Sequence, residues 1–120
     1  MHQVQGSKME KQIALDDFAA LDIRVGTIIE ARPAPEARQS AYQLKLDFGE
    51  LGERTSSAQI TDHYQPQDLV GRQVIAVVNS PPKRIGGFES QVLVLGAYQA
   101  DGSVRLLQLD GPIENGARLR

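Results

Sequence analysis

One segment of the sequence, residues 79–90, carries the residue types that could grip a phosphate group. It reads Asn-Ser-Pro-Pro-Lys-Arg-Ile-Gly-Gly-Phe-Glu-Ser. The two prolines stiffen its entry, and Gly86-Gly87 has no side chains to hold a ligand backbone at a distance. Lys83 offers a point charge and Arg84 a planar fork, which together suit a ribose-phosphate chain. These residues could form a phosphate-binding loop, but on their own they favour the alternative, a solvated hairpin loop whose basic pair aids solubility.

The overall charge restricts how such a loop could work. Across 120 residues, 13 Lys and Arg stand against 15 Asp and Glu, a formal net charge of −2. Bulk attraction to nucleic acid or to an anionic membrane is not offered by this balance, so binding needs a local basic patch. Other cations that could converge on one face are Arg24, Arg32, Arg38, Lys45, Arg54 and Arg72. Since phosphate contacts dominate nucleic-acid affinity, we expect modest, strongly salt-sensitive binding.

Patterns typical of catalytic and metal sites are missing from the sequence. Without cysteine there is no disulfide and no thiolate metal site, and two histidines cannot form a His-rich zinc site. His63, next to Asp62, is a poor general base candidate because adjacent side chains diverge and no nucleophile is placed by spacing. Ser56 and Ser57 lack a G-x-S-x-G or S-x-x-K context and are better explained by packing. We therefore predict a non-enzymatic protein with no catalytic residue, no metal and no cofactor.

Length and the N-terminal residues indicate the domain organisation. The 120 residues amount to about 0.8 of a typical domain, so one domain is expected. Residues 1–8 precede a second methionine, Met9, and are predicted to be a tag or an upstream extension. Residues 1–17 lack the apolar core of a secretory signal, and no run reaches the roughly eighteen apolar residues of a membrane span. These features predict a soluble cytoplasmic protein without membrane insertion.

The first strand is expected from Ile23, after one or two helical turns at Leu15–Leu21. Its residues alternate, with Ile23, Val25, Thr27 and Ile29 on one face and Arg24, Gly26, Ile28 and Glu30 on the other. This pattern is typical of a half-buried strand. Gly26 inside it indicates a bend, a bulge or a close backbone approach.

The remaining elements follow from apolar patterns and turn residues. Further strands are expected at residues 42–48, 54–60, 74–78, 92–95 and 104–109, with a short helix at Gln65–Gly71. Tyr42 and Phe48 fall on the core face of their strand, which leaves Phe88 as the loop's candidate for base stacking. The runs at 74–78 and 92–95 are apolar throughout. They indicate strands covered on both faces, with another subunit as one candidate cover.

This element order is that of an all-β protein with an OB-fold. The expected fold is a five-stranded β-barrel with one short helix between strands three and four, flanked by short helical or extended segments. On pattern alone, another small β-barrel or a sandwich is the alternative. Between the first two strands, residues 34–40 are expected to form a loop that carries Arg38.

Five blocks of sequence stand out when taken together. They are Leu21-Asp22-Ile23-Arg24-Val25-Gly26, Pro35-Glu36-Ala37-Arg38, Leu46-Asp47-Phe48-Gly49, Ser56-Ser57-Ala58-Gln59-Ile60 and the segment from Val77 to Ser90. In this order, over residues 16–120, they resemble the stand-alone tRNA-binding domain family. Ser57-Ala58-Gln59-Ile60 and Ser90-Gln91-Val92 are shared with its CsaA-type branch of export-related bacterial chaperones and favour that branch.

The resemblance implies an OB-fold in each subunit of a homodimer built partly from the segments that flank the barrel. Residues 9–20 would be an N-terminal flanking segment with a short helix, and residues 21–120 a tRNA-binding-type OB-fold domain with a C-terminal extension. Asp22, Arg24 and Gly26 match the family's opening signature. The residues implied to contact tRNA are Arg38, Asn79, Lys83, Arg84 and Ser90.

Two activities follow from the resemblance. The first is non-enzymatic binding of tRNA, in which a basic loop grips the tRNA backbone. The alternative is a chaperone that holds unfolded or preprotein peptides in apolar grooves and assists protein export. The implied partners are therefore tRNA, a second copy of the chain and, in the alternative, client peptides and the export machinery.

Overall fold

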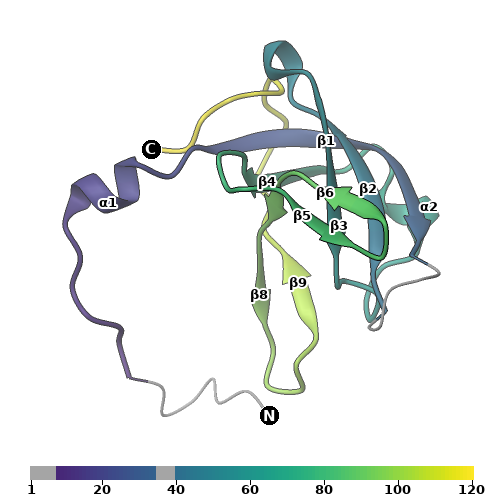
Figure 1. Ribbon diagram of the computed structural model, residues 1–120, viewed down its shortest axis with the longest axis horizontal. Helices are drawn as coiled ribbons and strands as arrows, with labels where there is room; N and C mark the ends of the chain where they lie inside the picture. The colour runs from purple at the N-terminus through teal and green to yellow at the C-terminus, as the bar shows by residue number, and fades with distance from the viewer. Residues whose placement is uncertain (1–7, 35–39) are drawn as a thin grey trace.

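The computed structural model describes residues 8–34 and 40–120. Its elements are α1 Leu15–Ala19, β1 Ile23–Pro33, β2 Tyr42–Asp47, the 3-10 helix η1 Gly49–Leu51, β3 Glu53–Ala58, α2 Pro66–Leu69, β4 Gln73–Val77, β5 Lys83–Ile85, β6 Phe88–Ser90, β7 Leu93–Val94, β8 Gly96–Tyr98 and β9 Val104–Leu106 (Figure 1). The short helix predicted near the N-terminus is present as α1.

Five antiparallel strands form the barrel, in the order β3-β2-β1-β4-β7. The two ends of this sheet meet because the backbone N–H groups of Gln91 and Val92 both donate to the carbonyl oxygen of Thr55, at 2.8 and 3.1 Å. The helix α2 lies between β3 and β4 in the chain, as predicted. This nearly closed five-stranded barrel confirms the OB-fold expected from the element order.

The barrel core is mainly aliphatic and includes three aromatic residues, Tyr42, Phe48 and Tyr64. Its most deeply buried side chains are Phe48, Ile28, Leu44, Leu46, Leu69 and Val74. The predicted inward face of residues 42–48 is confirmed. Tyr42 is also inside, and its hydroxyl donates to the carbonyl oxygen of Tyr64 at 2.7 Å, so its polar atom is satisfied without reaching solvent.

The strand β1 corrects one prediction, because it is not half-buried. Ile28 points into the barrel, whereas Ile23 and Val25 from the opposite face form a second cluster with β4 outside the barrel. At Gly26 the pairing with β4 is regular and the predicted close approach is present, since a Cβ there would lie 2.6 Å from the Phe48 ring, whereas the register shift lies between Ile28 and Glu30. Such a bulge bends a strand and changes its facing, which lets β1 pair first with β4 and then with β2.

The C-terminal tail covers the second cluster. Val25 N donates to the carbonyl oxygen of Ala117 at 2.9 Å, and Leu119 N donates to that of Ile23 at 2.8 Å. Leu119 and Leu95 pack on the cluster's apolar side chains. Both faces of β4 are therefore covered within one chain, as predicted. Within a single chain residues 92–95 are not covered on both faces, because Leu93 is 56% exposed; cover by another subunit stays a prediction.

Short strands are where pattern and structure differ most. The segment expected as a loop at residues 79–90 contains the β5–β6 hairpin, the third barrel strand ends at Ala58, and the strand expected at 104–109 ends at Leu106. Three-residue strands contain too few side chains to show a period of two. Their positions are fixed by tertiary contacts.

The N-terminal segment stands away from the barrel (Figure 1). Its helix α1 has no buried residue, and Leu15 is 86% exposed. No helix in residues 8–34 and 40–120 has the length and hydrophobicity that a bilayer span needs.

Candidate nucleic-acid interface

The β5–β6 hairpin carries both cations of the 79–90 segment. Its cross-strand pairs are Lys83 with Ser90, Arg84 with Glu89 and Ile85 with Phe88. Gly86 and Gly87 form the connection with φ values of 56° and 82°. Positive φ at both positions is what a tight hairpin turn that matches strand twist requires, and glycine adopts it without strain. The sequence predicted that these glycines let a ligand backbone approach closely. The structure shows that they also form the turn of the hairpin.

Neither cation is ion-paired with a carboxylate of the described residues. Within residues 8–34 and 40–120, Lys83 and Arg84 take part in no ion pair. Arg84 Nη1 donates to the carbonyl oxygen of Gly87 at 3.0 Å, which holds the guanidinium at the turn. Both residues are exposed. Because successive side chains of a strand point to opposite faces, the hairpin presents one cation on each face.

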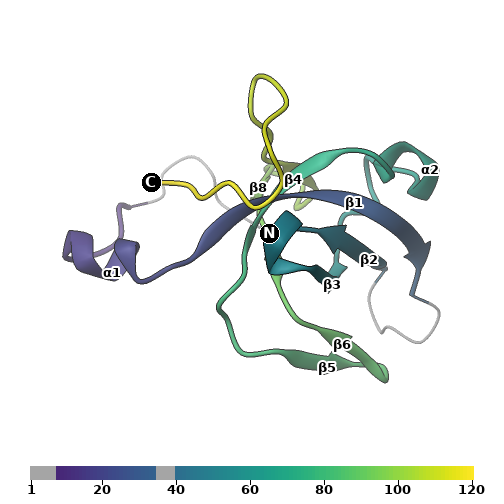
Figure 2. The same cartoon turned by 90° about the horizontal axis from the view of Figure 1, so that it is seen from above.

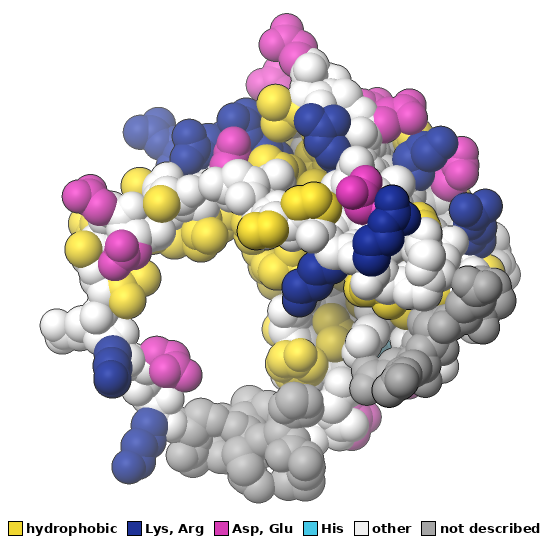
Figure 3. Space-filling model, viewed as in Figure 1, with side chains coloured by type: hydrophobic (Ala, Val, Ile, Leu, Met, Phe, Trp, Pro, Cys, Tyr) yellow, Lys and Arg dark blue, Asp and Glu magenta, His cyan; other side chains and the backbone are white. Residues whose placement is uncertain are grey.

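The hairpin lies beside the edge strand β3 (Figure 2). Ser57 N, on β3, donates to Ser90 Oγ at 2.9 Å. Further cations stand on the outer face of the adjoining strands: Lys45 Nζ lies 3.4 Å from Glu30 Oε2, and Arg32 Nε donates to Gln43 Oε1 at 3.1 Å. Figure 3 shows dark blue basic side chains mixed with magenta acidic ones on this side of the molecule. Among the described residues, Lys83, Arg84 and Arg32 form no ion pair, so the hairpin and the outer face of β1 both present cations that are not paired with a carboxylate.

Aromatic side chains do not form a platform on this face. Tyr42, Phe48 and Tyr64 are buried, and Phe88 is half-buried in the hairpin. Stacking of successive bases needs exposed rings. The groups that this face offers a nucleic acid are therefore mainly donors and cations suited to the sugar-phosphate backbone.

Asn79 is engaged within the protein. Its Oδ1 accepts from Asp22 N at 2.9 Å, and its Nδ2 donates to the carbonyl oxygen of Ala20 at 2.8 Å. The Asp22 carboxylate in turn accepts from Arg24 Nε at 2.5 Å and lies 3.6 Å from Arg118 Nε. The opening signature and Asn79 thus join the N-terminal segment, β1, the end of β4 and the C-terminal tail.

This cluster predicts a dependence of stability on pH. The hydrogen bond from Arg24 holds the pKa of Asp22 below its ordinary value, so Asp22 contributes stability that is present at neutral pH and lost as pH falls below about 4. Asp22→Asn should therefore lower the urea midpoint at pH 7, and the difference from wild type should shrink toward pH 2–3. A constant difference across this range would contradict the assignment. Asp101, whose pKa is also lowered by hydrogen bonds from Ser103, is unchanged in both proteins and cancels.

His63 lies in a hydrogen-bonded group that does not have the order of a catalytic triad. Its Nε2 is 2.8 Å from Ser103 Oγ, and that hydroxyl donates to Asp101 Oδ1 at 2.6 Å. In a triad the carboxylate binds the imidazole and the hydroxyl is accessible; here the carboxylate binds the serine, which is only 5% exposed. The group instead ties the β8–β9 hairpin to the loop before α2.

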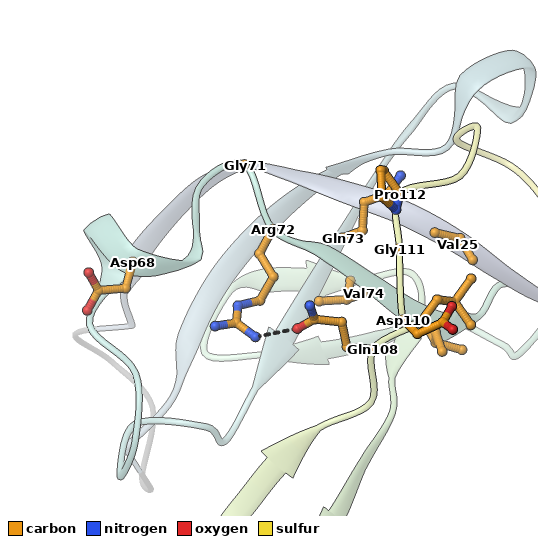
Figure 4. Close-up of a pocket in the computed structure, with 12 residues that line it drawn as sticks. Val25, Asp68, Gly71, Arg72, Gln73, Val74, Gln108, Asp110, Gly111 and Pro112 are labelled. Atoms are coloured by element: carbon orange, nitrogen blue, oxygen red, sulfur yellow. Dashed lines mark hydrogen bonds between the residues drawn. The ribbon is translucent and has the colours of Figure 1, made fainter.

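A cleft of about 440 Å³ opens between the start of β4 and the segment after β9 (Figure 4). Arg72 lies within it, where its Nη1 donates to Gln108 Oε1 at 2.9 Å and its guanidinium stands 5.1 Å from the centre of the Tyr64 ring. Asp68 and Asp110 also line the cleft. With its one cation already engaged and two carboxylates beside it, the cleft is a poorer place for a phosphate than the hairpin.

Comparison with known proteins assigns the chain to a family. A family described as "Putative tRNA binding domain" matches residues 23–118. The chain belongs to this tRNA-binding domain family. It is 38% identical to a methionine–tRNA ligase of Porphyromonas gingivalis over 116 residues, which are 97% of this chain but 17% of the ligase. The chain thus corresponds to a small part of that enzyme.

Solved structures of similar size share the fold. The chaperone CsaA of Bacillus anthracis strain Ames has a TM-score of 0.88 and 49% identity, over 92% of this chain and 100% of that one. The CsaA chaperone protein of Picrophilus torridus has a TM-score of 0.85 and 48% identity, over 91% and 100% of the two chains. The resemblance seen in the sequence, to the tRNA-binding domain family and to its CsaA-type branch, is confirmed.

Within this tRNA-binding domain the predicted contact residues separate into groups. Lys83 and Arg84 stand exposed on one hairpin, while the side chains of Asn79 and Ser90 are hydrogen-bonded to other segments of the chain. Arg38 lies outside the described residues. Sequence reasoning did not identify Thr55. Its backbone N–H, its carbonyl oxygen and its hydroxyl all form hydrogen bonds with residues 89–92, next to the hairpin. The small polar run around it was visible in the sequence, but its partners lie more than thirty residues away.

Proposed function

We propose that the chain is a non-catalytic tRNA-binding module that grips the ribose-phosphate backbone through the β5–β6 hairpin. The observation that carries the proposal is the exposed pair Lys83 and Arg84, without a carboxylate partner among the described residues, on a domain of a tRNA-binding family. OB-folds bind oligonucleotides on the face of strands two and three and on the loops that flank it. The hairpin occupies one of these positions, in the connection between β4 and β7.

The two cations contribute in different ways. Because Lys83 and Arg84 project from opposite faces of β5, the hairpin can enter a groove and meet phosphates on both of its sides. The other predicted loop contact, Arg38, belongs to the connection between β1 and β2 and is proposed as an additional phosphate contact. Asn79 and Ser90 support the proposed site by positioning the chain around the hairpin.

Titration with tRNA at several salt concentrations tests the hairpin. Lys83→Ala combined with Arg84→Ala should weaken binding at low salt by at least about tenfold. It should also reduce the slope of log Kd against log salt by about 0.7–0.9 for each phosphate that the variant no longer neutralises. Lys11→Ala combined with Arg105→Ala removes the same charge elsewhere and should bind nearly as wild type does. Equal binding by the hairpin variant and wild type, or no binding by wild type at low salt, would overturn the proposal.

We further propose that the tRNA-binding form is a homodimer. Leu93 and Tyr98 are 56% and 61% exposed, and Phe18 and Leu21 are also exposed on the N-terminal segment. Figure 3 shows hydrophobic side chains around the opening between this segment and the β8–β9 hairpin. Apolar groups gathered in this way mark an interaction surface. A second copy would cover them and bring two basic hairpins onto one particle.

Peptide binding is the second candidate function. The same exposed apolar residues could hold unfolded or preprotein segments, and the similar structures from Bacillus anthracis and Picrophilus torridus are described as chaperones. In this alternative the protein acts in the cytoplasm on client peptides and with the export machinery. Suppressed aggregation of a heat-unfolded client, competed by peptide and not by tRNA, would favour it over the tRNA proposal.

A further inference from the structure

We propose that a latch of hydrogen bonds between β3 and residues 89–91 aims Lys83 and Arg84, and that Thr55 and Ser90 are its positioning residues. This inference rests on the proposed tRNA-binding function. It assigns Ser90 the task of orienting the cations in place of a contact with the nucleic acid.

Three hydrogen bonds that use a side-chain atom make up the latch. Thr55 Oγ1 donates to the carbonyl oxygen of Glu89 at 2.7 Å, and Thr55 N donates to Gln91 Oε1 at 3.1 Å. Ser57 N donates to Ser90 Oγ at 2.9 Å. All of these groups are partly buried. Since Gln91 N and Val92 N also donate to Thr55, the latch continues the contacts that close the barrel.

The register of the hairpin connects the latch to the cations. Ser90, held by Ser57, is the cross-strand partner of Lys83, and Glu89, held by Thr55, is the partner of Arg84. Each anchored residue therefore lies directly across the ladder from one cation. The geometry fixes the strand β5 through its partner β6.

Without the latch the hairpin has little of its own to orient it. Its ladder has three pairs, Lys83–Ile85 is exposed along its whole length, and β5 pairs only with β6 among the described strands. An isolated two-stranded hairpin is marginally stable in water. Loss of the latch should leave the two cations attached to the barrel but free to point in several directions, which reduces the fraction in the binding orientation.

The salt dependence of binding separates positioning from contact. A neutral serine or threonine that touches tRNA changes the affinity and leaves the number of neutralised phosphates, and so the salt slope, unchanged. A neutral residue that aims two cations changes the slope, because misdirected cations no longer reach their phosphates. A slope change from a substitution that removes no charge is the signature of the latch.

The experiment uses the full chain carrying Thr55→Val and Ser90→Ala, with Thr61→Val as control, since the Thr61 side chain makes no hydrogen bond within residues 8–34 and 40–120. Amide hydrogen exchange should speed up at residues 83–90 of the double variant and stay unchanged in β1, β2 and β4. Binding of tRNA should weaken about tenfold at low salt, with a lower salt slope. When the same two substitutions are added to the Lys83→Ala and Arg84→Ala variant, the affinity for tRNA should not fall further.

Several results would overturn the proposal. Unchanged exchange in the hairpin would show that the latch does not hold it, and faster exchange with unaltered tRNA binding would show that it does not aim the cations. Weaker binding at an unchanged slope would make Ser90 or Thr55 a direct contact. If the double variant unfolds, Thr55→Val alone decides the question, because the backbone bonds of Thr55 stay intact. If wild type does not bind tRNA, the tRNA proposal fails, and with it the assigned purpose of the latch, whereas hydrogen exchange still tests the hold on the hairpin.

Discussion

Gly26→Ala is expected to destabilise the barrel by about 3 kcal/mol, at the upper end of the usual cost of overpacking. A Cβ at this position would lie 2.6, 2.8 and 3.0 Å from three carbon atoms of the Phe48 ring. That ring is completely buried in the barrel core, so it can move only by displacing other side chains. Urea denaturation at pH 7 measures the loss.

A double-mutant cycle tests the cause. Phe48→Leu removes the ring carbons that meet the new Cβ, so Gly26→Ala should cost less in that background than in wild type. The matched control is Gly111→Ala, where a Cβ meets nothing within 4 Å and the stability should stay within about 0.5 kcal/mol of wild type. Additive losses in the cycle would mean that Gly26 is required for a reason other than the ring.

The second large effect is expected at the proposed subunit interface. Leu93→Asp should convert a dimer into monomers, with a dimer Kd raised by at least about a hundredfold, because an uncompensated buried charge costs roughly 3–5 kcal/mol. In a two-fold dimer each substitution occurs twice, which increases the effect. Analytical ultracentrifugation across a concentration series measures the change. In the single chain Leu93 is exposed, so the fold and the thermal midpoint of the monomer should change little.

Val70→Asp provides the control, since Val70 is also exposed but lies at the end of α2, on the opposite side of the barrel from α1 in Figure 1. This variant should assemble as wild type does. If Leu93→Asp also remains dimeric, the interface lies elsewhere. If wild type is monomeric, and Leu93→Asp loses the ability to suppress aggregation of a heat-unfolded client, the apolar surface serves peptides instead of a second copy.

The parts of the fold that could be predicted are those with a local signal. Alternation at residues 42–48 identified the core strand, and Pro66 with Gly71 bounded the short helix, whose C-terminal glycine has a φ of 92°. Both signals arise from interactions between near neighbours in the chain. Lys83 and Arg84 were recognisable as an exposed basic pair for the same reason, because the two cations lie close to Gly86 and Gly87 in the sequence.

The remaining features depend on contacts between distant residues. Asn79 meets the backbone of Ala20 and Asp22, 59 and 57 residues away, and Thr55 meets residues more than thirty positions along the chain. No periodicity in one sequence encodes such partners. The prediction that β1 is half-buried was wrong for a related reason: its outer apolar residues, Ile23 and Val25, are covered by the C-terminal tail, which no local pattern links to them.

That tail also bears on the order in which the molecule can be assembled. Arg24 Nη1 donates to the carbonyl oxygen of Gly116, a contact that spans 92 residues, and Gly116 N donates to the carbonyl oxygen of Val25. During synthesis the barrel strands are all available before the tail emerges, whereas the cluster that contains Ile23 and Val25 lacks its cover from the tail until residues 116–119 have left the ribosome. The second cluster is therefore the last part of the domain to be covered. A nascent chain stalled before this point would expose the apolar face that β1 and β4 share there.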